Sequence, residues 1–426
     1  MSAAEPVLDA RDRDLLDGGQ GEAARLAMRL LVAAARAMDA PALLDIASAH
    51  VSGCFYSGRA GLDFAERLVD GGAQVAVPTT LNTGIVDLLH PDLQPAQERP
   101  LLELGRRQMD LYAAMGCEPT WTCAPYQRAV RPARGEHVAW GESSAVAFAN
   151  SVLGARTNKY GDFLDIACAI TGRVPDAGLH RSERRAGRVL VRVRDVDPAL
   201  LAQDAAYGVL GYLVGRAVGS AVPVVDGLPR TVTEDQLRAL GAAAAAGGGV
   251  ELFHAVGLTP EAPTLDAALQ GGDPERELSI DARALREGRD ELSTQAGDRL
   301  TAVCLGTPHM SAREVARVLE LLDGRRVHPD VAFYVSTGRN VLAGLRERGE
   351  DEALRRAGVR VVVDTCTYFA PFLRVRPGPV MTDSAKWAYY APGNLGVDVV
   401  FASTAECVRS AVEGRVRHDG ALWGEA

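Results

Sequence analysis

The sequence carries seven cysteines, and their spacing limits what they could do. They are Cys54, Cys117, Cys123, Cys168, Cys304, Cys366 and Cys407. An odd number spread over 426 residues is not the pattern of a disulfide framework, so the thiols are candidate core groups, metal ligands or nucleophiles. No Cys-x-x-Cys pair is present, which disfavours a zinc ribbon or a thioredoxin-type centre. Cys123 lies in the loop TWTCAPYQ, beside a proline that could hold a thiolate rigidly, although a structural cysteine fits equally well.

Two lysines stand out against the rest of the basic residues. Of the 46 basic side chains, all but Lys159 and Lys386 are arginine. An ammonium is a compact point charge, whereas a guanidinium is a planar fork, so these lysines are candidates for positions that arginine does not fill.

Two further segments combine polar groups at short spacing. SAHVSGC sets His50, Ser52 and Cys54 at alternating positions, on one face if the segment is a strand. A lone histidine there is usually a core residue, but three functional groups in register favour a site. GARTN places Arg156 and its two polar neighbours after a helical pattern, a combination suited to clamping an anion.

The elements that must position these groups read as an α/β protein of several units. Helical periodicity dominates near the N-terminus, short polar loops follow, and two later stretches alternate strand-like with helical runs. We expect a helical segment over 1–48, a loop-rich α/β domain over 49–186, an α/β domain over 187–261, a polar connector over 262–297 and a parallel α/β domain over 298–426.

The last domain predicts a functional edge. Strand patterns over 299–306, 330–336, 360–365, 379–382 and 397–403 alternate with helical ones, and ligands bind beyond the carboxyl ends of such strands. Any one Ser or Thr there is more simply a helix N-cap. Cys366 and Lys386 on the same edge favour a site.

Composition excludes several classes of function. A net charge of −9 and a pI near 5.5 argue against nucleic acid or an anionic membrane surface as partner. No apolar run approaches the roughly 20 residues of a membrane span, and the N-terminus lacks the features of a signal peptide, so we expect a cytoplasmic protein. Nucleotide-binding, dinucleotide-binding, GxSxG, HExxH and kinase motifs are absent.

Eight ordered blocks resemble one family. They are SAHVSG, TTLN, TCAPY, GESSAVAFANSVLGARTN, AITGRVPDAGLH, GTPHMSAREV, VVVDTC and TDSAKWAYYAPG. Together they resemble the large, catalytic region of the aconitase-X family. The resemblance implies aconitase-like α/β/α domains around a central cleft that holds an iron–sulfur cluster, and a hydro-lyase that dehydrates a small hydroxy acid. Activities in the family divide between cis-3-hydroxy-L-proline and mevalonate 5-phosphate dehydratases, and the former is our first expectation.

The resemblance also implies a ligand set, with one departure. Cys123 and Cys366 carry over as metal ligands, but Thr307 stands where family members often have a further cysteine. We expect Cys54 as the third ligand. Cys117 stays possible, while Cys304, Cys168 and Cys407 are better explained as core. The cluster type stays open between 2Fe–2S and 3Fe or 4Fe–4S, and loss of the cluster, leaving one metal ion or none, is the alternative.

Other roles follow from the same blocks. We expect catalytic roles for Lys386, His50 and Ser384. Residues expected to bind the small anionic substrate are Thr79, Thr80, Asn82, Ser143, Ser144, Arg156, Thr157, Asn158 and His309.

The family also uses a small swivelling domain that supplies a serine base. No such domain is evident here, so we expect a separate small subunit as the heterodimer partner. An aconitase-like isomerase and a non-catalytic iron-binding scaffold are alternatives, but a scaffold would not need the intact GARTN, TTLN and TDSAK blocks.

Overall fold

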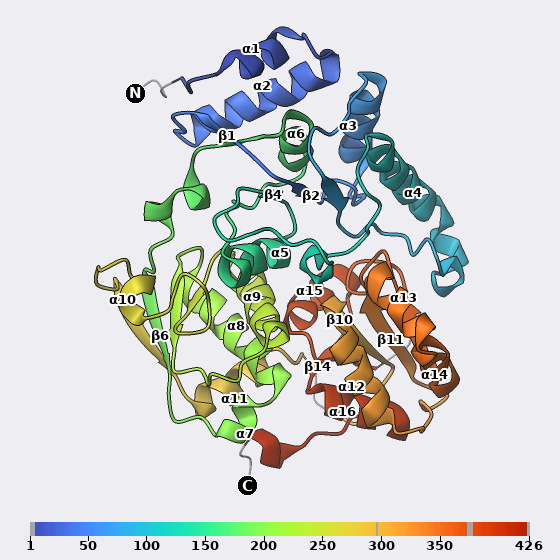
Figure 1. Cartoon of the computed structure of the whole chain (residues 1–426). Coiled ribbons are helices and arrows are strands. Elements are labelled where there is room, and N and C mark those ends of the chain that lie inside the picture. The colour runs from blue at the N-terminus through green and yellow to red at the C-terminus, as the bar shows by residue number, and fades with distance from the viewer. Residues whose placement is uncertain (1–4, 295–296, 373–377, 424–426) are drawn as a thin grey trace.

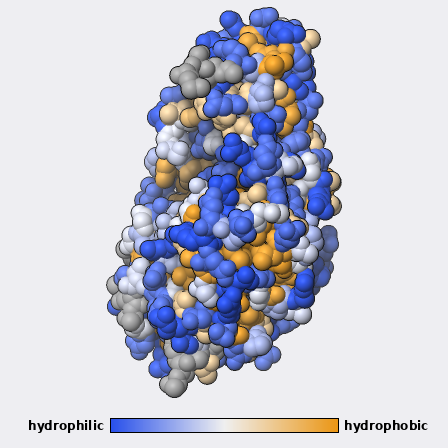
Figure 2. All heavy atoms as spheres, turned by 90° about the vertical axis from the view of Figure 1, so that its left-hand side faces the viewer, coloured by the Kyte–Doolittle hydropathy of each residue, from blue (hydrophilic) through white to orange (hydrophobic). Residues whose placement is uncertain are grey.

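The computed structural model describes residues 5–294, 297–372 and 378–423, arranged as three α/β units that meet at the centre of the molecule (Figure 1). The predicted mixed α/β class with parallel sheets is confirmed. Among the described residues, no helix is both long and apolar enough to cross a membrane. The face on the left of Figure 1 is largely hydrophilic, with apolar groups gathered in its lower half (Figure 2).

The first unit surrounds a short parallel sheet of order β3-β2-β4, and β1 pairs antiparallel with β5. Its strands are β1 (Leu43–Asp45), β2 (Ala49–Val51), β3 (Thr79–Leu81), β4 (Ala139–Trp140) and β5 (Arg173–Pro175). Its α-helices are α1 (Ala10–Asp17), α2 (Glu22–Ala37), α3 (Arg59–Asp70), α4 (Arg99–Ala114), α5 (Ser143–Phe148) and α6 (Leu164–Thr171). The N-terminal helices share a core with the rest of this unit, because the apolar stripe of α2 packs on α6.

The second unit is a four-stranded parallel sheet of order β8-β7-β6-β9. Its elements are β6 (Val189–Val193), α7 (Pro198–Leu201), α8 (Asp204–Val218), β7 (Pro223–Asp226), α9 (Glu234–Gly248), β8 (His254–Ala255), α10 (Leu265–Ala268), β9 (Arg276–Ile280) and α11 (Ala282–Glu291). The expected connector over 262–297 therefore contributes a strand and two helices, β9, α10 and α11, to this unit. Its strand is mostly exposed and buries fully only Ile280, so its pattern is nearly as polar as that of a loop.

Small residues let α8 and α9 pack closely. A methyl group on Gly211 would lie 2.1 Å from the Leu240 carbonyl oxygen, and one on Gly215 would lie 2.5 Å from that of Ala244. The AAAAAGGG tract of the sequence therefore belongs to a tightly packed helix, which ends in a left-handed cap at Gly249.

The third unit is a five-stranded parallel sheet of order β12-β11-β10-β13-β14. The strands are β10 (Ala302–Met310), β11 (Ala332–Thr337), β12 (Val359–Val362), β13 (Val380–Thr382) and β14 (Val399–Phe401). The helices are α12 (Ala312–Leu322), α13 (Arg339–Glu347), α14 (Glu350–Ala357), α15 (Ala385–Leu395) and α16 (Thr404–Glu413). Alternate residues of β10 enter two cores: Cys304 packs with residues of α8, α9 and α15, and Val303 with residues of α12, α13 and α16. The second and third units thus share one core.

Arg185 joins the first unit to the second. Its fully buried guanidinium lies 2.8 Å from Glu261 and donates to carbonyl oxygens of Asn150, Ala155 and Leu179. It thereby holds the π-helical turn Ala149–Leu153 that follows α5, and α5 carries site residues described below.

We expect Arg185→Met to lower the free energy of unfolding by about 3–5 kcal/mol, because it leaves a buried carboxylate and several carbonyl groups without their hydrogen-bond donor. Urea denaturation followed by circular dichroism measures this. Arg188→Met is the matched control, since the Arg188–Glu275 pair is 57% exposed on both sides. Equal stability of the two variants would contradict the structural role of Arg185.

Candidate functional site

Cys123 lies in a loop that continues the edge of the first sheet. The Thr122 N–H donates to the Leu81 carbonyl of β3 at 3.1 Å, and Trp121 adopts a left-handed backbone with φ 46°. The chain then turns into the short 3-10 helix Pro125–Gln127. The Cys123 thiol is buried at this turn.

Cys366 follows β12 in a turn that is fixed by a buried carboxylate. Asp364 has φ 65°, pairs with Arg339 at 2.8 Å and accepts the N–H of Leu88 at 3.1 Å. Burial raises the pKa of Asp364, and Arg339 opposes that shift. Because the turn is held from both the first and third units, the Cys366 thiol has a defined position.

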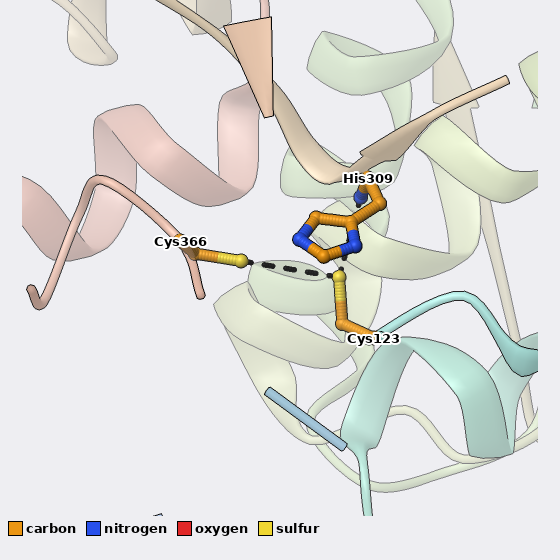
Figure 3. Close-up of side chains that lie close together, drawn as sticks. All are labelled: Cys123, His309 and Cys366. Atoms are coloured by element: carbon orange, nitrogen blue, oxygen red, sulfur yellow. Dashed lines mark hydrogen bonds between the residues drawn. The ribbon is translucent and has the colours of Figure 1, made fainter. Parts of the chain in front are cut away.

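His309 reaches the same point from β10, not from beyond its end. The register between β10 and β11 shifts between Leu305 and Met310. At the start of this irregular stretch, Gly306 has φ 95°, and a side chain there would collide with the Ser336 carbonyl, whose oxygen would be 2.2 Å from a Cβ. The irregular backbone turns His309 toward the two thiols (Figure 3).

The three side chains form one group. One ligand atom from each of Cys123, His309 and Cys366 lies within 4.8 Å of the others, and the two Sγ atoms are 3.9 Å apart (Figure 3). Two thiolates bound to one tetrahedral metal at about 2.3 Å would be roughly 3.8 Å apart. The sulfur pair therefore has the spacing of two ligands that share a metal centre.

His309 is fixed through both its ring and its backbone. Its Nε2 lies 3.0 Å from the Thr365 carbonyl, to which it must donate. In the neutral ring Nδ1 then keeps a lone pair, which accepts from the Thr122 hydroxyl at 3.1 Å. The His309 carbonyl accepts from Arg238 at 2.6 Å and from Gln127 at 3.0 Å. Nδ1 is the ring atom that could bind a metal, and the Thr122 hydroxyl would then have to give up its hydrogen bond to it.

The pKa values of the two thiols are shifted in opposite directions. Burial opposes ionisation of Cys123, but the hydrogen bond from Cys366 and the neighbouring His309 lower the pKa of Cys123 to about 6. The His309 N–H also donates to this sulfur at 3.2 Å. The hydrogen bond to Cys123, followed by burial, raises the pKa of Cys366 well above its ordinary range. The opposite shifts favour ionisation of Cys123 and a proton on Cys366, which makes the two sulfur atoms a polarised pair of soft donors.

A buried ion pair joins the first and third units beside this group. Lys386, in the first turn of α15, contacts Oε1 of Glu142, which caps the N-terminus of α5. Burial opposes both charges, yet Lys386 lowers the pKa of Glu142 to about 2 and Glu142 raises that of Lys386. Asn82 donates to the other Glu142 oxygen at 3.1 Å.

A cavity of about 220 Å³ opens onto Glu142. Most of the lining is polar, and two aromatic side chains that follow Cys366, Tyr368 and Phe369, also line it. The lining residues are Ser52, Phe55, Asn82, Thr83, Gly141, Glu142, Ser143, Lys159, Asp162, Tyr368 and Phe369. This volume suits a small organic acid.

The structure brings part of the predicted set together. Cys123, Cys366 and His309 form the group above, Lys386 pairs with Glu142, and Asn82 and Ser143 line the cavity. The Ser144 hydroxyl donates to Glu142 at 2.9 Å. Ser384 caps α15 and donates to the Thr307 carbonyl, which places it at the same edge but outside the cavity wall.

Other predicted residues make contacts that are internal to the fold. His50 is buried against Thr80 at 2.8 Å, and burial lowers its pKa to about 4. Thr79 donates to the Val77 carbonyl. The remaining three, in the GARTN block, bind the chain's own backbone: Arg156 binds the His180 carbonyl at 2.7 Å, Thr157 that of Asn158, and Asn158 that of Ala177. Because the Arg156 guanidinium already donates to the His180 carbonyl and the Ser182 hydroxyl, its anion-binding role stays a prediction.

Cys54 lies outside the ligand group. It is fully buried in the core of the first unit, and its thiol donates to the Asn82 carbonyl at 3.3 Å. Burial raises its pKa well above the ordinary range, so it stays a thiol. The three donors that the structure brings together include His309 in place of Cys54.

Two contributors were not identified from the sequence. Glu142 carries the only sequence signal, as an acid directly before a helical run, which also describes an ordinary N-cap. Arg238 lies in α9, 71 positions from the carbonyl it binds, and no local pattern marks it.

Comparison with known proteins decides the family. Models of the aconitase X first, second and third domains match residues 5–183, 187–290 and 300–413. The chain belongs to the aconitase X family. The resemblance drawn from the sequence is confirmed, and so is the aconitase-like fold: the crystal structure of holo-form aconitase X from Thermococcus kodakaraensis matches with a TM-score of 0.84 and 33% identity, over 95% of this chain and all of that one.

Curated relatives of this aconitase X chain are dehydratases. It is 46% identical to cis-3-hydroxy-L-proline dehydratase of Pseudomonas aeruginosa, over 97% of this chain and 71% of the relative. It is 39% identical to the phosphomevalonate dehydratase large subunit of Methanothermobacter thermautotrophicus, over 94% of this chain and 98% of the relative. These relatives confirm the prediction of a carbon–oxygen lyase.

The polarised thiol pair predicts a titration. In metal-free protein, thiolate absorbance near 240 nm should rise with a midpoint of about pH 6, because Cys123 is protonated below that pH and ionised above it. Cys123→Ser should abolish this step, and Cys366→Ala should move the midpoint upward by removing the hydrogen-bond donor. Cys168→Ala, at a buried thiol with a raised pKa, is the control. A wild-type midpoint near the ordinary value of about 8.5 would contradict the assignment.

Proposed function

We propose that this chain is the large catalytic part of a dehydratase that removes water from cis-3-hydroxy-L-proline. The observation that carries the proposal is the grouping of Cys123, Cys366 and His309 beside the Glu142–Lys386 pair. The substrate follows from the 46% and 40% identity to dehydratases of that amino acid from Pseudomonas aeruginosa and Hypocrea jecorina.

The donor set fits an iron or iron–sulfur group. Thiolates are soft ligands, their spacing suits a shared metal centre, and an imidazole nitrogen lies within reach. Cys123 and Cys366 would hold the group, with His309 Nδ1 as third donor. When bound, it would supply a Lewis acid for the departing hydroxyl oxygen.

The chain's own residues prepare the substrate's surroundings. Glu142 stays ionised at the cavity wall because Lys386 and Asn82 neutralise and orient it. The amide and hydroxyl groups of Asn82, Ser52 and Ser143 offer neutral hydrogen bonds around a small polar ligand. Tyr368 and Phe369 add aromatic surface to the otherwise polar wall, which a small ring could pack against.

A base for the substrate C–H is still needed, since dehydration removes a proton as well as the hydroxyl. We propose that a small swivelling domain supplies it through a serine, as the sequence resemblance implies. The name "large subunit" carried by the phosphomevalonate relatives supports a partner of this kind.

Dehydration of phosphomevalonate is the second candidate. It is favoured by a match over 98% of the length of the Methanothermobacter large subunit. Assaying both substrates with the small domain present, and identifying the products, separates the two. A third outcome, rehydration of the alkene to an isomer, would indicate an aconitase-like reaction.

The metal assignment predicts which cysteines retain iron. After anaerobic purification, Cys123→Ser and Cys366→Ser should each lose most of the bound iron, because each removes one of two sulfur donors. Cys54→Ser should keep the wild-type iron and sulfide content, since its thiol bonds only to nearby carbonyls. Colorimetric iron and sulfide analysis measures this. Loss of iron in Cys54→Ser alone would reverse the assignment.

Lys386→Arg should lower kcat about 10²-fold, because a displacement of about 1 Å at a site commonly has that effect and the planar fork does not fit the space around Glu142. Dehydratase kinetics with the small domain present measures the loss. Arg283→Lys, on the exposed face of α11, is the control for exchange between the two cations. Near-normal turnover in Lys386→Arg would show that the ion pair is only structural.

A further inference from the structure

Both lysines of this arginine-rich chain are connected to the cavity that Glu142 lines. Lys386 reaches the cavity through Glu142, and Lys159 lines the cavity directly. Sequence reasoning singled out both, but only Lys386 has so far been given a role.

Local backbone geometry sends Lys159 to the cavity. The segment 158–160 lies beside β4, where Lys159 forms a single bridge to Trp140 and the Tyr160 N–H donates to the Trp140 carbonyl at 3.2 Å. Its neighbours Asn158 and Tyr160 are buried and hydrogen-bond to each other at 3.3 Å, whereas Lys159 is exposed and lines the cavity.

Within the described residues, neither Lys159 nor its neighbour Asp162 is engaged in an ion pair. The Lys159 backbone N–H donates to Glu251 at 3.0 Å, but no carboxylate lies within 4.0 Å of its ammonium. Asp162 also lines the cavity, and Lys159 is near enough to counteract the burial that raises the pKa of Asp162. Both charges are available to a ligand.

Three charged residues line the cavity, Glu142, Lys159 and Asp162, and with Lys386, which pairs with Glu142 behind the wall, the four charges sum to zero. Glu142 is balanced by Lys386, and Lys159 by Asp162. A doubly ionised phosphate with an additional carboxylate would need surplus cations. A zwitterionic amino acid needs one cation and one anion.

We propose that Lys159 binds the carboxylate and Asp162 the ring ammonium of the substrate, so that this pair selects a hydroxy amino acid over a phosphorylated hydroxy acid. The inference rests on the proposed dehydratase function and deepens it. It transfers to Lys159 the anion-binding role that the sequence assigned to Arg156, whose guanidinium is held by His180 and Ser182.

Steady-state kinetics on the complete enzyme, with the small domain present, tests the pair. Lys159→Gln should raise KM for cis-3-hydroxy-L-proline about 10²-fold and leave kcat within a few-fold, because one charge-assisted contact is lost. Lys159→Arg should recover part of the affinity. Arg283→Gln, which removes an exposed positive charge on α11, should change neither constant. A KM within twofold of wild type in Lys159→Gln overturns the proposal.

Binding without turnover separates this proposal from the proposed function. Calorimetry with L-proline, pyrrolidine and tetrahydrofuran-2-carboxylate should show binding of L-proline to wild type. Lys159→Gln should weaken the binding of the two carboxylates, L-proline and tetrahydrofuran-2-carboxylate. Asp162→Asn should weaken the binding of the two amines, L-proline and pyrrolidine. Binding with this pattern but no dehydration would overturn the function and keep the pair. Turnover that both variants leave unaltered would overturn the pair and keep the function. No binding of L-proline and no turnover by wild type would overturn both.

Discussion

The hydrogen bonds around His309 are the constraint on which the site depends, because all three units meet at this one residue. The first unit contributes Thr122 and Gln127, the second contributes Arg238, and the third contributes Thr365 through its carbonyl. The His309 N–H also donates to Cys123. A relative movement of any unit would therefore disturb the imidazole and the thiolate together.

Around this residue, buried charge is arranged in compensated pairs. The Cys123 thiolate receives hydrogen bonds from Cys366 and from the His309 backbone, and Glu142 is matched by Lys386. Isolated, each of these charges would be costly to bury, and the partners of each one lower that cost. The buried Arg238 is also paired, since it contacts Glu314 while it binds the His309 carbonyl. At the cavity, Glu142, Lys159 and Asp162 of the wall sum to zero charge only together with Lys386 behind Glu142.

Sequence reasoning identified residues whose position follows from a strand end and missed those that depend on packing between units. Cys366 and Lys386 each follow a predicted parallel strand, so their shared edge was predictable from topology. The sequence around Arg156 predicts an anion clamp, but its guanidinium donates to the His180 carbonyl. That partner lies 24 positions later in the chain, and no local pattern predicts the contact. Glu142 resembled an ordinary N-cap, and its pairing with Lys386 spans 244 positions. Cys54 has the spacing of a site residue, yet β2 ends at Val51 and the turn that follows places Cys54 in an apolar core, away from Ser52 at the cavity.

The central claim is that a metal group binds between Cys123, Cys366 and His309. Anaerobic crystals measured on either side of the iron absorption edge test it most directly. We predict one anomalous difference peak within bonding distance of both sulfur atoms and of the His309 ring. A protein that contains iron but shows its peak elsewhere, for example beside Cys54, would contradict the account.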